Sequence, residues 1–176
     1  MRNIFLIGYR ATGKTTVAKL LARRLSCDWI DSDHEIERRA GKTIAQIFED
    51  DGEPAFRDWE SKVVQDLTKS DGVVIALGGG AVVRQENREA IASAGIVFWL
   101  TASAKAIIER LRDDVDNVGR RPALSQSAPE DEIRQLLEQR TPVYAECATF
   151  ETDTDGLSPQ EVADQLHSYV IKTSWF

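Results

Sequence analysis

The sequence has no hydrophobic run that approaches the roughly 18 residues needed to cross a membrane. The short apolar run near its start, Ile4-Phe5-Leu6-Ile7, leads into Gly8 and not into a signal-peptide cleavage site. We therefore expect a cytoplasmic protein that makes no contact with a membrane.

Cysteine is also scarce, and basic residues are fewer than acidic ones. The chain of 176 residues contains two cysteines, Cys27 and Cys147, whose separation fits no metal site, and a disulfide framework is not expected in a cytoplasmic chain. Both are interpreted as packing residues. The 22 Lys and Arg are outnumbered by 29 Asp and Glu, which gives a net charge of −7. This balance argues against nucleic-acid binding, and an anionic ligand must be bound by locally clustered Arg and Lys.

Internal repeats and low-complexity tracts are absent, and the length suits a single domain over residues 1–176. Short apolar runs alternate with longer helical patterns, which is typical of βα units around a parallel sheet. The runs show little alternation, so we expect the strands to be buried on both faces. The expected strands cover 3–7, 28–30, 73–77, 96–100 and 149–152, and the expected helices cover 14–25, 53–67, 104–112, 129–139 and 159–169.

One stretch, residues 113–128, fits neither pattern because it is rich in Asp, Asn, Gly, Ser and Pro and has few apolar residues. It cannot bury a face against the domain. It is either a solvated loop or a mobile lid over a site, and long loops without their own secondary structure are often functional. We favour the lid.

A phosphate-binding motif follows the first strand. Residues 8–15 read Gly-Tyr-Arg-Ala-Thr-Gly-Lys-Thr and match G-x-x-x-x-G-K-[ST] between a strand and a helix, the context that a P-loop requires. Its glycines let backbone N–H groups surround an anion, and the helix N-terminus adds a favourable dipole. In such a motif Lys14 reaches the β- and γ-phosphates and Thr15 offers its hydroxyl to Mg²⁺. The expected nucleotide-binding residues are Ala11, Thr12, Gly13, Lys14, Thr15 and Thr16.

A P-loop enzyme usually also has an acid near the magnesium ion. The strands at 73–77 and 96–100 are followed by Gly78 and Thr101, whereas the strand at 28–30 is followed by Asp31. By elimination, Asp31 is expected to act with Thr15 at the metal, through a water. The alternative is that Asp31 only caps the helix that follows it.

A P-loop alone does not separate a kinase from a regulatory GTPase or a non-catalytic ATP sensor. A GTPase needs D-x-x-G after an early strand and N-K-x-D after a later one. The D-x-x-G matches at 116–119 and 153–156 lie too late, and the loose N-K-x-D imitation at 68–71 precedes a strand. An ATP sensor needs no pocket for a second substrate, whereas the remaining motifs build one.

Five further motifs occur in a fixed order. They are DSD at 31–33, FRDWE at 56–60, GGGA at 78–81, RRP at 120–122 and RTPVY at 140–144. This ordered set resembles the shikimate kinase family from Met1 to about Tyr144. The resemblance implies a three-layer α/β sandwich with a five-stranded parallel sheet, of the P-loop kinase type, with a mobile lid. It also implies the phosphorylation of the 3-hydroxyl of shikimate by ATP, which yields shikimate 3-phosphate and ADP on the route to chorismate and the aromatic amino acids.

The resemblance assigns a role to each part of the second pocket. Arg57 and Arg140 match positions that bind the carboxylate of shikimate, and bidentate geometry suits arginine to that task. Asp33 matches the carboxylate that binds the ring hydroxyls and accepts the proton of the attacking one. Gly79 and Gly80 let the ring approach the backbone closely.

Three more side chains are assigned roles, the first from its spacing and the other two from the resemblance. Glu60 lies one turn after Arg57 and is expected to hold its guanidinium. Arg110 is implied to stack on the adenine, and Arg121 to enter the site from the closed lid and bridge toward the phosphates. The expected catalytic residues are therefore Lys14, Asp33 and Arg121.

The expected ligands are ATP with Mg²⁺, and shikimate, and we expect a monomer. The alternative is a related kinase acting on another small polyol acid, such as gluconate. It would share the P-loop and the lid. The combination of Arg57 and Arg140 with Asp33 favours shikimate, because it fits a ring that carries a carboxylate opposite a hydroxyl.

Overall fold

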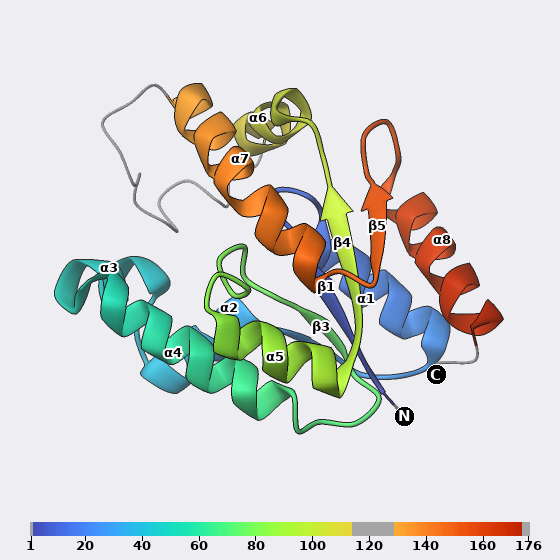
Figure 1. The fold of residues 1–176 in the computed structure, drawn as a ribbon, viewed down its shortest axis with the longest axis horizontal. Coiled ribbons are helices and arrows are strands. Elements are labelled where there is room, and N and C mark those ends of the chain that lie inside the picture. Colours follow the sequence, from blue (N-terminus) through green and yellow to red (C-terminus); the bar gives the residue numbers. More distant parts are fainter. Residues whose placement is uncertain (1, 114–128, 174–176) are drawn as a thin grey trace.

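The structure is a computed structural model that describes residues 2–113 and 129–173. These residues form one sheet with the strand order β2-β3-β1-β4-β5, in which all neighbouring strands are parallel. Helices cover both faces of the sheet (Figure 1), so the predicted α/β sandwich is confirmed. The strands are β1 (Asn3–Ile7), β2 (Trp29–Asp31), β3 (Val74–Ala76), β4 (Gly95–Thr101) and β5 (Phe150–Asp153). The helices are α1 (Lys14–Leu25), α2 (Ser32–Ala40), α3 (Ile44–Asp50), α4 (Gly52–Leu67), α5 (Gln85–Ala94), α6 (Ala104–Asp113), α7 (Pro129–Cys147) and α8 (Pro159–Lys172).

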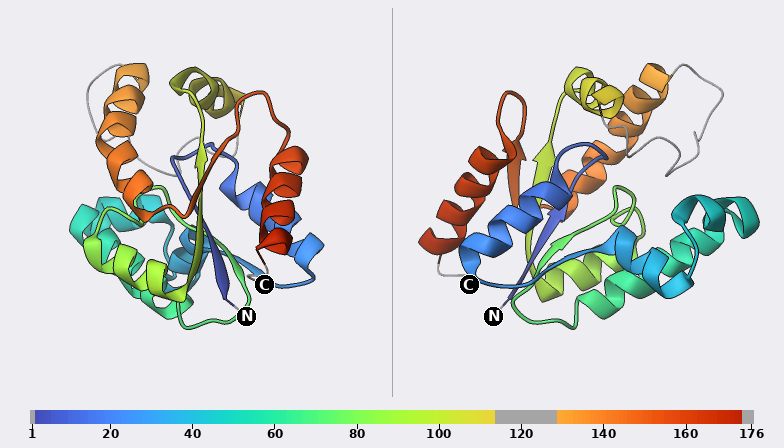
Figure 2. Two further views of the ribbon diagram at one scale, coloured as in Figure 1. Left: turned by 45° about the vertical axis from the view of Figure 1, so that its right-hand side comes forward. Right: turned by 180° about the vertical axis from the view of Figure 1, so that it is seen from behind.

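Two separate cores lie on the two faces of the sheet. Helices α1 and α8 cover one face, and α4 and α5 cover the other, as Figure 2 shows. Strand β1 divides its side chains between the cores: Ile4 and Leu6 pack toward α1, whereas Phe5 and Ile7 pack toward α4. Successive residues of a strand point to opposite faces, so a strand covered on both sides must be apolar throughout. No helix in the described part of the chain is long and apolar enough to cross a membrane.

A third, smaller cluster joins α6 and α7 to the loop after β1. Tyr9 of that loop packs with Ile107 and Ile108 of α6 and with Ile133 of α7. Figure 1 shows α6 and α7 at the end of the sheet to which β4 and β5 point. These two helices flank residues 114–128, so the P-loop contributes directly to the packing of the helices on either side of that segment.

The edge strands differ from the prediction of burial on both faces. All three residues of β2 are half-buried, and β5 alternates between half-buried and exposed residues. Each of these strands has only one neighbour, β3 or β4 respectively. The prediction of two buried faces holds for the three central strands, β3, β1 and β4, apart from the terminal residues of β4.

Three short helices were missing from the predicted set. Helix α2 buries only Ser32 and Ile36, and α5 buries only Asn87 and Ile91. Helix α3 has seven residues and starts at a capping box formed by Thr43 with its partner Gln46. Helices α2 and α5 each bury one apolar residue, and the seven-residue α3 buries only Ile44 and Ile47. None of them repeats an apolar residue often enough to show a period of 3.6, so hydrophobic periodicity could not detect these three.

The predicted end of the helix at 129–139 is wrong. Helix α7 continues to Cys147 and contains Pro142 in its interior. Proline removes a backbone donor and commonly ends or kinks a helix, which is why the sequence suggested a stop. Here Tyr144, beyond the proline, is buried against Trp99 with ring centroids 5.8 Å apart, and this packing accompanies the continued helix.

The predicted lid starts one residue too early, because Asp113 belongs to α6, and its remaining residues 114–128 lie outside the described ones.

An ion-pair network fixes α2 to α4. The Glu35 carboxylate accepts hydrogen bonds from Arg38 at 2.7 Å and Arg39 at 2.6 Å, and Arg39 also donates to Asp66 of α4 at 2.6 Å. The hydrogen bond from Arg38 and then that from Arg39 lower the pKa of Glu35 from 4.5 to about 2. Ionised Glu35 therefore favours the folded state, and it does so in the helix that carries Asp33.

We predict that Glu35→Gln lowers the melting temperature at pH 7 by about 2–4 °C, the shift expected for a loss of about 1 kcal/mol in a chain of this size. The folded pKa of about 2 lies below the unfolded value of 4.5, so the stabilisation is complete above about pH 5 and is lost as the pH falls toward 2. The difference between wild type and variant, measured by thermal unfolding, should shrink from pH 7 to pH 3. Glu49→Gln, at an exposed position of α3, is the control. A difference independent of pH would contradict the assignment.

Candidate active site

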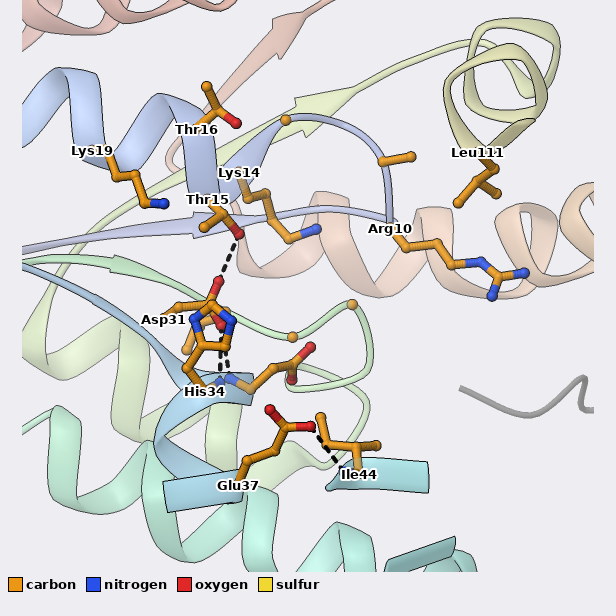
Figure 3. A pocket seen from close by; sticks show the side chains of 16 residues that line it. Arg10, Lys14, Thr15, Thr16, Lys19, Asp31, His34, Glu37, Ile44 and Leu111 are labelled. Carbon is orange, nitrogen blue, oxygen red and sulfur yellow. Dashed lines mark hydrogen bonds between the residues drawn. The ribbon is translucent and has the colours of Figure 1, made fainter. Parts of the chain in front are cut away.

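A cleft of about 420 Å³ lies where β1, β2 and β3 end. Its walls come from the P-loop and the start of α1, from the start of α2, and from the loop after β3 (Figure 3). Parallel α/β sheets bind ligands beyond the carboxyl ends of their strands, so this is the expected place for a site. The predicted site residues that line it are Ala11, Gly13, Lys14, Thr15, Thr16, Asp31, Asp33 and Gly79.

The P-loop takes a backbone shape that depends on glycine. Gly8 has φ of 136°, and a Cβ there would lie 2.3 Å from the carbonyl oxygen of Leu100 in β4. Gly13 has φ of 90° and is the N-cap of α1, and no side chain at this cap accepts a hydrogen bond from the first N–H groups of the helix. Uncapped N–H groups at a helix N-terminus form an anion site. The geometry thus supports the predicted phosphate-binding function of the motif.

Lys14 is buried and lies across the P-loop. Its Nζ donates to the carbonyl oxygens of Gly8 at 2.9 Å and Tyr9 at 2.7 Å. The hydroxyl of Thr12 donates to the same Tyr9 oxygen at 2.8 Å. Thr12 is thus a buried brace of the loop, whereas Lys14 places its charge on the wall of the cleft.

Asp31 is the helix cap that the sequence offered as one alternative, and it also contacts the P-loop residue Thr15. Its Oδ2 accepts a hydrogen bond from the Thr15 hydroxyl at 2.6 Å, so the carboxylate lies beside the P-loop (Figure 3). Its Oδ1 accepts from the backbone N–H of Asp33 at 2.9 Å and of His34 at 3.3 Å, so Asp31 is also the N-cap of α2. One carboxylate thus joins the P-loop to the helix that carries Asp33.

The start of α2 is also tied to the loop after β3. Ser32 is fully buried, and its hydroxyl oxygen accepts a hydrogen bond from the N–H of Gly78 at 2.9 Å. Its neighbour Asp33 is half-buried and lines the cleft, together with the exposed His34. The position of Asp33 relative to the glycines is therefore fixed through Ser32.

Arg57, on α4, contacts the loop after β3 that contains Gly78, Gly79 and Gly80, here named the glycine loop. Its Nη1 lies 2.6 Å from Oε2 of the buried Glu60, as expected from their spacing, and its Nη2 lies 3.0 Å from Glu53. Burial acts to lower the pKa of Arg57, but the attraction of Glu60 and then the contact with Glu53 outweigh it and raise the pKa. A Cβ on Gly80 would lie 2.1 Å from Nη1, so the absence of a side chain there makes room for the guanidinium.

Arg140 reaches the same loop from α7. Its Nη1 donates to the carbonyl oxygen of Gly79 at 3.2 Å, and its guanidinium carbon lies 5.9 Å from the centre of the Tyr9 ring. Of the predicted acceptor residues, Asp33 and Gly79 line the cleft. Arg57, Gly80 and Arg140 do not line it, but the two arginines contact the glycine loop at Gly80 and Gly79 respectively.

Arg110 connects the P-loop to the segment after β5. Its Nη1 donates to the carbonyl oxygen of Ala11 at 3.3 Å and to the hydroxyl of Thr154 at 3.0 Å, and its Nη2 donates to the carbonyl of Thr154 at 2.8 Å. The guanidinium is thus held beside the P-loop at the edge of the nucleotide site. Arg121, the remaining predicted residue, lies outside the described residues.

Comparison with known proteins decides the family. The family model described as shikimate kinase matches residues 10–170. The chain belongs to the shikimate kinase family. It is 46% identical to a shikimate kinase of Methylococcus capsulatus over 94% of this chain and 90% of the relative. It is 43% identical to one of Thermodesulfovibrio yellowstonii over 94% of this chain and 93% of the relative. The chain is accordingly a kinase, and it transfers a phosphoryl group from a nucleotide.

Solved structures agree with this family assignment. A shikimate kinase from Acinetobacter baumannii in complex with shikimate is 36% identical, has a TM-score of 0.91 and matches 100% of this chain and 96% of its own. A gluconokinase from Sinorhizobium meliloti has a TM-score of 0.58 and 16% identity, and it covers 98% of this chain and 97% of its own, so it shares the fold alone.

Sequence reasoning assigned no role to four residues that support the site, although two of them, Ser32 and Tyr144, lie within the quoted motifs. Ser32, Glu53, Tyr144 and Thr154 each hold a predicted site residue or loop through a hydrogen bond. Glu53 precedes Arg57 by one helical turn, so its spacing was a usable signal. The other three act on partners far away in the chain, and no local spacing indicates such contacts.

We predict that Gly8→Ala destabilises the fold and abolishes nucleotide binding. The region near φ of 136° is open essentially to glycine alone, and the added Cβ would also overlap Leu100. Gly156→Ala is the matched control, because Gly156 has φ of 72° but no atom within 4 Å of the added Cβ. That control should lose only about 1–2 kcal/mol and keep its affinity for ADP, measured by calorimetry. Equal losses in the two variants would show that the contact with β4 does not matter.

Proposed function

We propose that this chain transfers the γ-phosphoryl group of ATP to the 3-hydroxyl of shikimate, giving shikimate 3-phosphate and ADP in the biosynthesis of aromatic amino acids. The observation that carries the proposal is the convergence of Arg57 and Arg140 on the loop at Gly79 and Gly80, next to Asp33 and the P-loop. The family assignment and the likeness to a shikimate kinase in complex with shikimate support the same substrate.

The residues of the acceptor pocket match the chemistry of shikimate. Arg57 and Arg140 bind the carboxylate, because a planar guanidinium forms paired, charge-assisted hydrogen bonds with it. The backbone of Gly79 and Gly80 provides a wall without side chains against which the ring lies. Asp33 binds the reacting hydroxyl, orients its oxygen toward the γ-phosphorus and accepts its proton as the new oxygen–phosphorus bond forms.

The P-loop residues bind the nucleotide. The backbone N–H groups of residues 11–16 surround the phosphates, and Lys14 stabilises the negative charge that spreads over the transferring phosphoryl group. Lys14 now donates to two carbonyl oxygens of its own loop, so it exchanges these partners for phosphate oxygens when ATP binds. Arg110, held by Thr154, provides a flat cationic surface for the adenine.

Thr15 and Asp31 fit a magnesium ion. Their side-chain oxygens lie 2.6 Å apart on the wall of the cleft, and hard oxygen donors are the ligands that Mg²⁺ prefers. Magnesium in nucleotide sites is usually held by one or two protein groups, substrate phosphates and waters, so this pair is sufficient. When bound, the ion neutralises charge on the β- and γ-phosphates.

Residues 1–176 act as one kinase domain and as a monomer in this proposal.

The proposal is tested by coupled measurement of ADP release with shikimate, quinate, gluconate and nucleoside monophosphates as acceptors. Only shikimate should give saturable turnover, and Lys14→Ala should reduce that turnover by a factor of about 10²–10³ or more because transition-state charge is left uncompensated. Lys105→Ala, whose side chain is 83% exposed on α6, is the matched control and should retain full activity. Preferred turnover of another acceptor would overturn the substrate, and an active Lys14→Ala with unchanged circular dichroism would overturn the role of the P-loop lysine.

We predict that Asp33→Asn lowers kcat by about tenfold to a hundredfold with little change in ATP affinity. The amide keeps the shape of the side chain but cannot accept the proton, and phosphoryl transfer has a loose transition state that limits the effect of a base. Steady-state kinetics with both substrates varied provides the measurement. Asp71→Asn, at an exposed loop position, is the control. A normal kcat in the Asp33 variant would reduce Asp33 to a structural residue of α2.

A further inference from the structure

The hydroxyl of Tyr144 donates a hydrogen bond to the carbonyl oxygen of Gly79, the same atom to which Nη1 of Arg140 donates at 3.2 Å. Tyr144 follows Arg140 by one helical turn in α7, so the two side chains project from one face of the helix. One backbone oxygen of the glycine loop thus has two side-chain donors, one neutral and one charged.

The Tyr144 ring is held in place by packing. Its residue is 1% exposed, and its centroid lies 5.8 Å from that of Trp99, a buried residue of β4. Arg140, in contrast, is half-buried, and its guanidinium lies over the ring of Tyr9. Tyr144 is therefore the fixed donor of the pair, and Arg140 is the donor that can change partners.

Such a change is required if Arg140 binds a substrate carboxylate. Its Nη1 must leave the carbonyl of Gly79, which belongs to a buried residue. A buried carbonyl oxygen that loses its donors is costly, because the oxygen is removed from water without compensation. With Tyr144 in place, the oxygen keeps one donor after Arg140 has left.

The loop also carries the backbone against which the acceptor lies. Ser32 holds the N–H of Gly78 from one side, and Tyr144 holds the carbonyl of Gly79, one residue later. Two consecutive residues of the loop are therefore fixed by buried side chains that do not themselves line the cleft.

We propose that Tyr144 is a positioning residue for the acceptor site: it holds the Gly79 carbonyl so that Arg140 is released to bind the substrate carboxylate. This inference rests on the proposed function, because it takes shikimate as the acceptor and Arg140 as its carboxylate ligand. Tyr144 touches neither substrate. It lowers the free-energy cost of moving the Arg140 guanidinium from the Gly79 carbonyl to the substrate carboxylate.

Tyr144→Phe removes the hydroxyl and keeps the ring against Trp99. In this variant Arg140 is the remaining side-chain donor to Gly79 among the described residues, so its release leaves the carbonyl uncompensated. The KM for shikimate should rise about five- to thirtyfold, the size expected for one buried hydrogen-bond partner. The KM for ATP should stay within about twofold, because the hydrogen bonds given above for Thr12, Lys14 and Thr15 go to other residues.

Tyr169→Phe is the matched control. Tyr169 lies on α8, packs against Phe150 and Phe98, and is 40% exposed on the far side of the sheet from α7. It loses the same hydroxyl and should show unchanged kinetic constants. Thermal unfolding of both variants separates a loss of stability from the effect on shikimate.

A double-mutant cycle isolates the mechanism. Arg140→Met keeps an unbranched apolar side chain beside Tyr9 but has no positive charge with which to bind a carboxylate. In that background Tyr144→Phe should change kcat/KM for shikimate by less than about twofold, because no arginine is left to be released. The same factor in both backgrounds would show that Tyr144 merely shapes the loop, and the proposal would be wrong.

The other outcomes are equally decisive. Equal changes in both KM values, or a lower melting temperature of Tyr144→Phe with unchanged kinetics, would reduce Tyr144 to a structural residue. Failure of the proposed function is seen separately, as a wild-type chain that does not phosphorylate shikimate. In that case the inference about Tyr144 falls with it, whereas an active wild type with a kinetically normal variant overturns the inference alone.

Discussion

The register of the three strands β2, β3 and β1 is the constraint on which the site depends. Ala76 of β3 pairs with Leu6 of β1 on one side and with Asp31 of β2 on the other. The three strands therefore end close to one another at the same edge of the sheet. As a result, the P-loop, the cap of α2 and the glycine loop begin side by side. A slip of one residue would turn every side chain of a strand to the opposite face, and it would separate Asp31 from Thr15.

The loops are then joined to one another by single hydrogen bonds and close contacts. Asp31 bridges the P-loop and α2, and Ser32 bridges α2 and the glycine loop. An added Cβ on Gly79 would lie 3.4 Å from the carbonyl oxygen of Gly8, so the glycine loop returns to the P-loop in direct contact. The three loops form a closed ring of contacts. Each residue of the proposed acceptor pocket is connected to the P-loop by at most two such contacts.

Much of this arrangement was predictable because its signals are local. The P-loop is eight consecutive residues, the pair of Arg57 and Glu60 is separated by one helical turn, and Asp31 stands at the end of a strand. The contacts that the sequence analysis missed join distant residues: Ser32 and Gly78 are 46 positions apart, and Tyr144 and Gly79 are 65 apart. Such pairs are brought together by the sheet order, and neither a spacing nor a hydrophobic period indicates them. Pro142 misled in the opposite direction, because a local rule for helix ends was overridden by the packing of Tyr144.

Tyr9 belongs to the P-loop, yet its ring packs with α6 and α7 and lies under the guanidinium of Arg140. In the proposed function, one aromatic residue therefore belongs to the nucleotide site and also contacts the arginine that binds the carboxylate. If binding of the nucleotide moves that ring, the factor by which ATP changes the affinity for the acid acceptor must equal the factor by which the acceptor changes the affinity for ATP, since linkage between two sites is reciprocal. The order in which the two substrates enter then leaves the total binding free energy unchanged, and Tyr9, the second residue of the P-loop, would be the group that couples them.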